Sequence, residues 1–433
     1  MRLALICWLA ILRCLSAAEL PERVDNSLSP AFPPIIRQTH ESCAQDVGLS
    51  TMMTYAWNRH HGSSAAEPHN QFAGLFVWNF LNRGGNRGAE LVEGWHLARA
   101  IGIPRVTDYT TTPSLGEWPT GYALYYSAMK QRVRSYRSFP LNNEAQLLII
   151  KERLSRGELF GIEGRLRGFE QLSIPKGQHE EGKLLVLRWG RNGKGHVMTY
   201  VGYDNRVGHD MNGDGRLTND LDLDGDGDVT LADWERGAFI AVNSYGSEWG
   251  DAGKCYVLFR ESAVTPFQRG RWASTLAVFP DHQPLLTLRL KLQSTCQSAI
   301  RLRIEANPRK TYSPILFDSV ARSGPAPQEG PDQYNRFLTG ERRLSLGPAR
   351  QSGQGQVLPV ELGLDLTGQL PLKTANYRLL FHLDRAQHPA AAGTVLEASL
   401  LRYRSNGALI SETVFADLPQ AMRSTEQGCL LQR

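Results

Sequence analysis

The chain has 433 residues, with 48 lysines and arginines against 43 aspartates and glutamates, so its formal charge is only +5. This length fits about three domains and leaves room for sizeable hydrophobic cores. A charge this small, without a basic run that alternates with aromatic residues, gives no support for a nucleic-acid partner. Six cysteines in so long a chain also exclude a small domain held together mainly by disulfides.

Residues 1–18 have the pattern of an export signal. Arg2 precedes the apolar run LALICWLAIL, and the small residues Ser16, Ala17 and Ala18 follow it, as a cleavage site requires. We therefore expect a secreted or periplasmic protein, with an uncleaved membrane anchor as the alternative. No later segment is apolar for long enough to predict a transmembrane helix.

Residues 38–57, QTHESCAQDVGLSTMMTYAW, contain the strongest candidate for chemistry. From Cys43 onward, apolar side chains recur at the spacing of a largely buried helix. Ser42 is in the position of an N-cap, so Cys43 would lie in the first helical turn. Because unpaired N–H groups and the helix dipole favour a thiolate there, we expect a lowered pKa for this cysteine.

Helical patterns come first in the chain and strand patterns follow. Helices are predicted at 75–81, 89–103 and 141–157, while 127–139 fits either a helix or a strand. From residue 184 the chain changes to strand-like runs at 184–189, 196–204, 239–246 and 254–260. Residues 19–280 are therefore predicted to form an α+β domain, with a helical sub-layer, an antiparallel β sub-layer and a cleft between them.

A base and its orienter are predicted on two of these strands. His196 begins one strand, after two glycines that would let a substrate approach the backbone, and Asn243 ends the next strand. If the two strands are neighbours, Asn243 can hold one ring nitrogen of His196 while the other takes the proton of Cys43. Gln38 and the backbone N–H of Cys43 are the predicted donors to the oxyanion.

The composition changes sharply between residues 204 and 235, where ten acidic side chains occur with only two arginines. Two loops there have the spacing of calcium-binding loops, in which alternate carboxylates converge on the cation and a glycine allows a sharp turn. The clearer loop begins at Asp222 and ends at Asp233, where aspartate replaces the usual glutamate, which resembles dockerin-type repeats. The other begins at Asp210 and would be closed by Asp220 or Asp222. The candidate ligands of a structural Ca²⁺ are Asp210, Asn212, Asp214, Asp220, Asp222, Asp224, Asp226, Asp228 and Asp233. A solvated acidic segment without metal is the alternative.

Beyond residue 280 the chain is a series of short strand patterns. Apolar and polar residues alternate with period two in segments separated by Gly, Pro and Asn. We expect residues 281–433 to form an all-β sandwich with a binding or spacer role, whose ligand remains unknown.

Four cysteines remain if residues 1–18 are removed: Cys43, Cys255, Cys296 and Cys429. Cys255 lies in a strand-like run and is predicted to be a buried apolar thiol. With Cys43 reactive, we expect Cys296 and Cys429, near the two ends of the C-terminal region, to form the disulfide.

Together, these segments resemble papain-like cysteine peptidases. That family has a Gln before a Gly-Ser-Cys-type motif, then a Gly-His strand, and then Asn-Ser-Trp-Gly followed by Trp-Gly. The matching residues here are Gln38, Ser42–Cys43, Gly195–His196, Asn243–Gly246 and Trp249–Gly250. The resemblance covers residues 20 to 262 and implies hydrolysis of protein or peptide substrates through a thioacyl-enzyme, with no metal in the chemistry. It also implies that the acidic segment is inserted between His196 and Asn243.

Two departures from the family pattern keep other functions open. Tyr245 replaces a Trp, and the spacing between Gln38 and Cys43 is one residue shorter. An inactive, peptidase-fold binding or adhesion protein is therefore the alternative, and acyl transfer to an amine is a third possibility.

Overall fold

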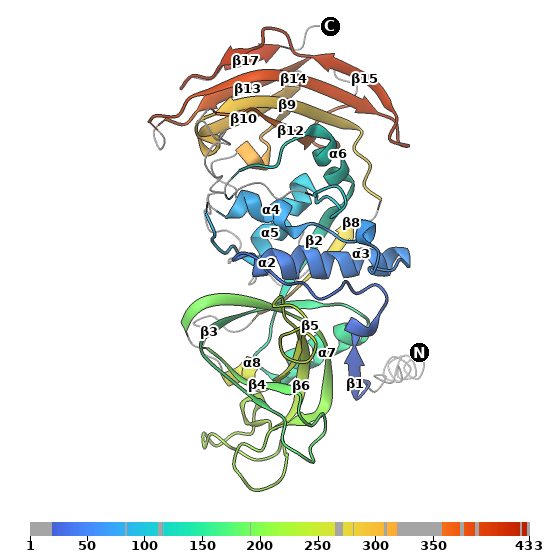
Figure 1. The fold of residues 1–433 in the computed structure, drawn as a ribbon, viewed down its shortest axis with the longest axis vertical. Helices are drawn as coiled ribbons and strands as arrows, with labels where there is room; N and C mark the ends of the chain where they lie inside the picture. Colours follow the sequence, from blue (N-terminus) through green and yellow to red (C-terminus); the bar gives the residue numbers. More distant parts are fainter. Residues whose placement is uncertain are drawn as a thin grey trace, which may run out of the picture.

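In the computed structural model, the chain forms three layers stacked along its long axis (Figure 1). Most of the helices lie in the middle layer, most strands of one large sheet lie on one side of them, and the C-terminal sheets lie on the other side. The structure describes residues 20–433 apart from 83–84, 111–114, 116, 191, 265–271, 280, 307–309, 318–356, 373–375, 386–388, 425–426 and 431–433. The predicted signal, residues 1–18, therefore lies outside the described residues.

The predicted helix at Cys43 is present as one continuous helical segment with three parts. A short α-helix, α2 (Cys43–Gln45), leads into the π-helical η2 (Asp46–Met53) and then into α3 (Thr54–His61). The segment ends at Gly62, whose positive φ of 65° forms the C-cap. Its apolar side chains, including Leu49 and Met53, are buried, as the periodicity predicted.

Further helices follow along the chain. They are α4 (Gly74–Leu81), α5 (Leu91–Ile101), α6 (Tyr122–Lys130), α7 (Glu144–Ser155) and α8 (Glu261–Val264), with single 3₁₀ turns at η1 (Asn26–Leu28) and η3 (Pro68–Asn70). Helix α5 begins with a capping box formed by Glu90 and Glu93 and ends at Gly102. A side chain at Gly102 would place its Cβ 1.9 Å from the Ala128 carbonyl oxygen, so only glycine fits there. The ambiguous stretch 127–139 completes α6 and then forms a strand.

Eight strands among the described residues form the large sheet, in the order β1-β5-β6-β7-β4-β3-β8-β2. Strand β5 also pairs with β3, which closes β5, β6, β7, β4 and β3 into a ring. The sheet is mixed, since β4 pairs with β7 in parallel, and the prediction of an antiparallel layer is wrong at this point. The strands are β1 (Arg23–Asp25), β2 (Arg132–Pro140), β3 (Phe160–Ser173), β4 (Leu184–Gly190), β5 (Asn192–Gly208), β6 (Arg236–Val242), β7 (Lys254–Leu258) and β8 (Trp272–Phe279).

Two antiparallel sheets follow within the described part of 281–433. Their orders are β11-β10-β13-β17 and β12-β9-β14-β15, with β16 paired to β14. The strands are β9 (Leu286–Ser294), β10 (Ile300–Ala306), β11 (Lys310–Tyr312), β12 (Val360–Asp365), β13 (Tyr377–Leu383), β14 (Gly393–Tyr403), β15 (Leu409–Val414), β16 (Gln420–Ala421) and β17 (Gln427–Leu430), with 3₁₀ turns at η5 (Gln297–Ala299) and η6 (Ile315–Phe317). Within this region, where strand patterns were expected throughout, Ile315–Phe317 form a 3₁₀ turn, and residues 318–356 lie outside the described residues. A self-contained β-sandwich domain stays a prediction.

The C-terminal sheets share their core with the helical layer. One cluster of buried apolar side chains includes Met52 from the helical layer and Leu290 from β9. Polar groups cross the same boundary: the Arg132 guanidinium contacts the buried Asp365 carboxylate at 2.7 Å, and the Tyr122 hydroxyl lies 2.7 Å from that of Tyr403. The predicted boundary at 280/281 is therefore crossed by continuous packing.

None of the helices within the described ranges combines the length and the hydropathy needed to cross a bilayer. Cys255 is buried in β7, as predicted. The predicted disulfide between Cys296 and Cys429 depends on a side chain outside the described set and stays a prediction.

Candidate active site

Cys43 lies where the helical layer meets the large sheet. Its side chain is 9% exposed, at the start of α2. The backbone N–H groups of Val197 and Ala44 are directed at the sulfur. Val197 follows His196 in β5, so the fold brings the predicted nucleophile to the strand that carries the predicted base.

His196 and Asn243 are hydrogen-bonded to each other. The side chains are 2% exposed, and Nε2 of His196 lies 2.8 Å from Oδ1 of Asn243. The Ser244 backbone N–H also donates to this Oδ1, at 2.8 Å. Since a backbone N–H can only donate, this atom is the amide oxygen and Nε2 carries the proton. Nδ1 of the neutral ring is then the basic nitrogen.

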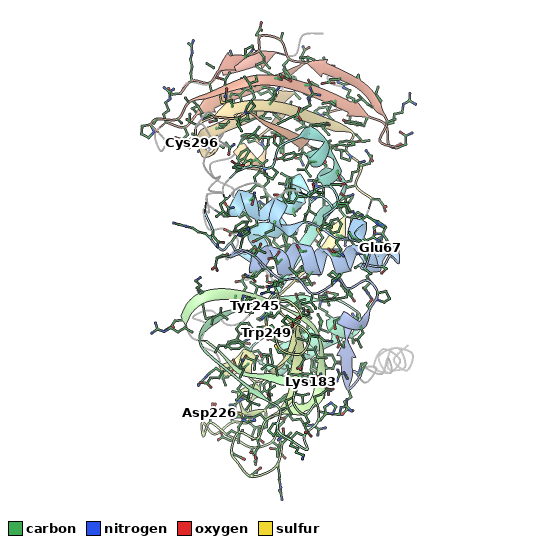
Figure 2. All side chains as sticks on the ribbon, viewed as in Figure 1. Glu67, Lys183, Asp226, Tyr245, Trp249 and Cys296 are labelled. Carbon is green, nitrogen blue, oxygen red and sulfur yellow. The ribbon has the colours of Figure 1, made fainter. Side chains whose placement is uncertain are left out.

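Tyr245 covers the histidine. Its ring stacks on that of His196 with centroids 4.6 Å apart, and its hydroxyl lies 3.5 Å from Nδ1. Trp249 meets Tyr245 edge-on at 6.2 Å. Figure 2 shows both aromatic residues at the junction of the helical layer and the large sheet. The aromatic stack restricts the imidazole to one orientation.

Gln38 belongs to the same cluster. Its Oε1 accepts a hydrogen bond from the Ser244 hydroxyl at 2.6 Å, and its backbone N–H donates to the Ser244 carbonyl at 2.8 Å. Its Nε2 donates to the His40 carbonyl at 2.8 Å. The side-chain amide is therefore oriented by the residue next to Asn243, and Nε2 has a second N–H to offer.

The prediction of a lowered cysteine pKa is wrong. Burial raises the pKa of Cys43 to about 11, although the Val197 N–H lowers it. Ser42 does not cap the helix with its side chain, because its hydroxyl donates to Oδ2 of Asp46 at 2.6 Å. Asp46 is buried one turn from the sulfur, and its negative charge also raises the pKa of Cys43. Burial lowers the pKa of His196, while the bond to Asn243 raises it.

Asp46→Asn should therefore stabilise the protein at neutral pH. Burial raises the pKa of Asp46 from 3.8 to about 6. As pH rises, this carboxyl therefore loses its proton at a lower pH in the unfolded chain than in the folded protein. Stability of the wild type falls as pH rises from about 4 to about 6 and stays reduced above that. The variant should gain up to roughly 3 kcal/mol in free energy of unfolding at pH 7. Urea unfolding at pH 7 and just below pH 4 tests this, and an equal gain at both pH values would contradict it.

The acidic segment connects β5 to β6. In its second loop, ligand atoms of Asp222, Asp224 and Asp226 lie within 4.8 Å of one another. Asp233 is buried and accepts from the backbone N–H groups of Leu223, Asp224 and Thr230 at 2.8 to 3.2 Å. These hydrogen bonds, against the opposing effect of burial, lower the pKa of Asp233. A hard cation fits this set of carboxylates.

The backbone of the first loop is held by a buried glutamate that the spacing of the acidic residues did not predict. Buried Glu235 accepts from the backbone N–H groups of Met211, Asn212 and Thr218 at 2.6, 3.4 and 3.1 Å. Counted from Asp210, these are positions 2, 3 and 9, the positions whose N–H groups Asp233 binds in the second loop. Glu235 is therefore placed behind the first loop as Asp233 is behind the second, while closure of a metal site by Asp220 or Asp222 stays a prediction. The signal available in the sequence was a threonine at position 9 of each loop, Thr218 in the first loop and Thr230 in the second.

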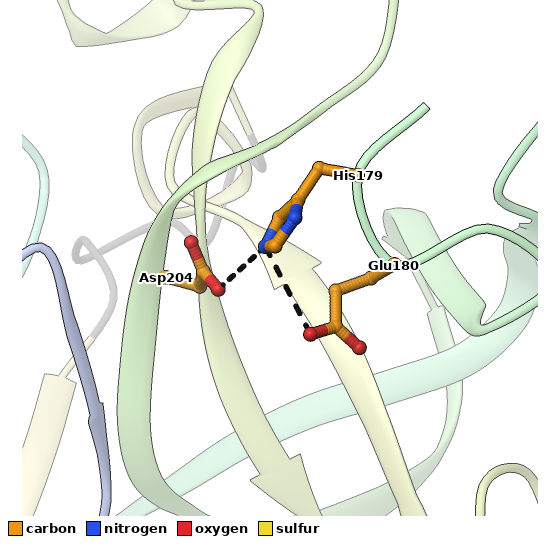
Figure 3. A group of neighbouring side chains, drawn as sticks. All are labelled: His179, Glu180 and Asp204. Atoms are coloured by element: carbon orange, nitrogen blue, oxygen red, sulfur yellow. Dashed lines mark hydrogen bonds and ion pairs between the residues drawn. The ribbon is translucent and has the colours of Figure 1, made fainter. Parts of the chain in front are cut away.

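A further cluster, His179, Glu180 and Asp204, is held by ion pairs (Figure 3). Nε2 of His179 lies 2.9 Å from Asp204 and 3.8 Å from Glu180. The Arg23 guanidinium contacts both carboxylates. Hydrogen bonds from Arg206 and His179 outweigh burial and lower the pKa of Asp204 to about 2. With Arg23 between them, these groups attach β1 to the sheet and do not form an open metal site.

No family model matches the chain, and no curated protein matches it. Solved structures with a similar arrangement of elements include xylellain, a cysteine protease from Xylella fastidiosa (15% identity, 60% of this chain and 87% of that chain, TM-score 0.39). Procathepsin B from Trypanosoma congolense has 13% identity, with 60% of this chain and 79% of that chain covered and a TM-score of 0.39. The bromelain protease from Ananas comosus has 14% identity, with 60% of this chain and 99% of that chain covered and a TM-score of 0.36. These neighbours are papain-like cysteine proteases. Identities and TM-scores this low leave the family of the chain unassigned.

Proposed function

We propose that this protein is an exported cysteine endopeptidase with Cys43, His196 and Asn243 as its catalytic triad. One observation carries the proposal: Oδ1 of Asn243 accepts the Nε2 proton of His196 at 2.8 Å and leaves Nδ1 as a base. The sulfur of Cys43 lies against the backbone of the next residue, Val197. A buried nucleophile, base and orienter from distant segments are the parts that acyl transfer requires.

The reaction follows from these positions. Nδ1 of His196 takes the proton of Cys43 as the sulfur forms a bond to the substrate carbonyl carbon. The backbone N–H of Cys43 and the second N–H of Gln38 donate to the oxyanion. The imidazolium then protonates the leaving amine as the C–N bond breaks. Water, deprotonated by His196, attacks the thioester, and the departing sulfur regains a proton.

A digest of a peptide library with the mature protein tests the proposal. Mass spectrometry should detect new peptide termini and a Cys43 adduct with an epoxide probe. Binding without cleavage or labelling would instead favour the inactive binding or adhesion protein. Products ligated to added amines would indicate acyl transfer to an amine in place of hydrolysis.

Asn243→Ala should lower kcat/KM by about 10²-fold, the low end of what a positioned acid–base group contributes. Without Oδ1, the ring loses its orientation and its preferred tautomer. The bond to Asn243 raises the pKa of His196, so its loss should lower that pKa. Because the neutral imidazole is the base, the rising acid limb of the pH profile should move to lower pH. A slower enzyme with an unmoved acid limb would show that Asn243 acts only structurally.

We also propose that the acidic segment binds structural Ca²⁺. Supporting this, ligand atoms of Asp222, Asp224 and Asp226 lie within 4.8 Å of one another, and Asp233 and Glu235 occupy equivalent places behind the two loops. Asp210, Asn212 and Asp214 supply the first loop, and the carbonyl of Asp228 supplies the second. Bound Ca²⁺ would neutralise the carboxylates and join both loops to the start of β6, the strand that precedes Asn243.

A further inference from the structure

An ion pair links the segment of the nucleophile to the segment of the base. Nζ of Lys194 lies 2.7 Å from Oε1 of Glu41. Glu41 lies two residues before Cys43, in the segment that leads into the helical layer. Lys194 lies two residues before His196, in β5. The pair therefore joins the two layers two residues away from both Cys43 and His196.

The Glu41 carboxylate influences the candidate base through its charge. Its negative charge raises the pKa of His196, against the larger effect of burial, and also raises that of Tyr245. Its position is fixed from the backbone, because the Glu41 N–H donates to Oδ1 of Asn86 at 2.7 Å. A substrate bound next to Cys43 would thus meet this carboxylate close to its scissile bond.

A different carboxylate, from β3, acts on the sulfur. Glu163 in β3 stands opposite Val197, accepts from the Leu91 N–H at 3.2 Å, and raises the pKa of Cys43 through its charge. Arg165, two residues further on, donates to the Gly193 carbonyl at 3.2 Å. The negative charges that act on the sulfur are therefore those of Asp46 and Glu163, whereas Glu41 acts on His196.

The ion pair is easily exchanged. The side chains of Lys194 and Glu41 are 74% and 39% exposed, and a pair this exposed gains little free energy in water. An ammonium or guanidinium group on a bound peptide would make the same contact with Glu41, in a site from which the peptide itself excludes water. Such a charged hydrogen bond is stronger than the exposed one that it replaces.

We propose that Glu41 recognises a basic side chain of the substrate adjacent to the scissile bond, and that Lys194 occupies this position in the free protein. This inference rests on the proposed peptidase function and names its substrate class. Lys194 acts as an internal competitor: it keeps Glu41 paired until a lysine or arginine of the substrate displaces it.

Matched peptides that differ only by Lys, Arg, Gln or Glu beside the cleavage site provide the test. Wild type should cleave the basic peptides with kcat/KM about 10- to 100-fold above the Gln peptide, the value of one hydrogen bond to a charged group. Glu41→Gln should lose this preference. Lys194→Gln should lower KM for basic peptides several-fold with little change in kcat, because the competitor is removed.

The exchange variant Glu41→Lys/Lys194→Glu separates recognition from structure. The exchange variant keeps an ion pair between the two layers. If the wild-type pair only held the layers together, the variant would therefore still prefer basic peptides. Recognition by Glu41 instead predicts that the preference turns toward the Glu peptide. The same exchange at Lys291 and Glu397, which lie 2.6 Å apart on β9 and β14, is the control and should change no preference.

The outcomes distinguish the two proposals. Cleavage without charge preference, or an exchange variant that still prefers basic peptides, would overturn this inference and leave the peptidase function standing. A folded wild type that cleaves no peptide would overturn both. Rates of Cys43 modification by aminoethyl and sulfonatoethyl methanethiosulfonate, compared between wild type and Glu41→Gln, give a readout independent of hydrolysis. In the wild type, the cationic aminoethyl reagent should modify Cys43 faster than the anionic sulfonatoethyl reagent. In Glu41→Gln this difference in rate should disappear.

Discussion

Cys43→Ala is expected to abolish peptide hydrolysis, with a loss in kcat/KM on the order of 10⁴-fold or more. No thioacyl-enzyme can form without the sulfur, and the remaining groups would only bind the substrate and polarise its carbonyl. The measurement is cleavage of a defined peptide by wild type and variant at equal concentrations of folded protein. Circular dichroism and thermal melting establish that the variant is folded, since alanine removes only one small, nearly buried group.

Cys255→Ala is the matched control. This thiol is also buried, but it lies in β7 and burial raises its pKa strongly. The control should cost about 1 kcal/mol in free energy of unfolding and leave hydrolysis per folded molecule unchanged. Epoxide labelling should be lost in the Cys43 variant and retained in the control. Hydrolysis that survives Cys43→Ala would refute the proposed mechanism and point to another class of enzyme.

Removal of calcium should produce the second large effect, on stability. Binding only to the folded state adds RT ln(1 + [L]/Kd), which is about 2.7 kcal/mol per site at a hundredfold excess over Kd. For a chain of this size, each site should raise Tm by about 3 °C. The measurement is thermal melting in 1 mM Ca²⁺ and in excess chelator, with Mg²⁺ as the competing ion. A Tm that chelator does not change would refute the calcium proposal.

Variants assign the closing residue of the first loop. Glu235→Gln keeps an acceptor for the Met211 and Thr218 N–H groups but removes the charge that the cation needs. It should lose about half of the calcium-dependent increase in Tm. Asp220→Asn, at a position predicted from spacing alone, should lose little. The reverse result would show that Asp220 closes the loop and that Glu235 only braces the backbone.

Local structure was largely predictable because it depends on local periodicity. The helix at Cys43, the helix ending at Gly102 and the strands around His196 all follow from the spacing of apolar residues. The parallel pairing of β4 with β7 was not predictable, since strand direction depends on long-range connections that the alternation of side chains does not record.

The sequence by itself determined which residues are available for chemistry: a cysteine at a helix start, a histidine and an asparagine on consecutive strand patterns, and two acidic loops. Only the tertiary structure decided how they are placed. It set the tautomer of His196 through Asn243, placed Glu235 behind a loop that begins 25 positions earlier, and paired Glu41 with Lys194 across two layers. It also reversed the expected direction of the Cys43 pKa. The physical reason is that a helix terminus is a local feature, whereas desolvation and approach of charges depend on which distant segments pack around the group.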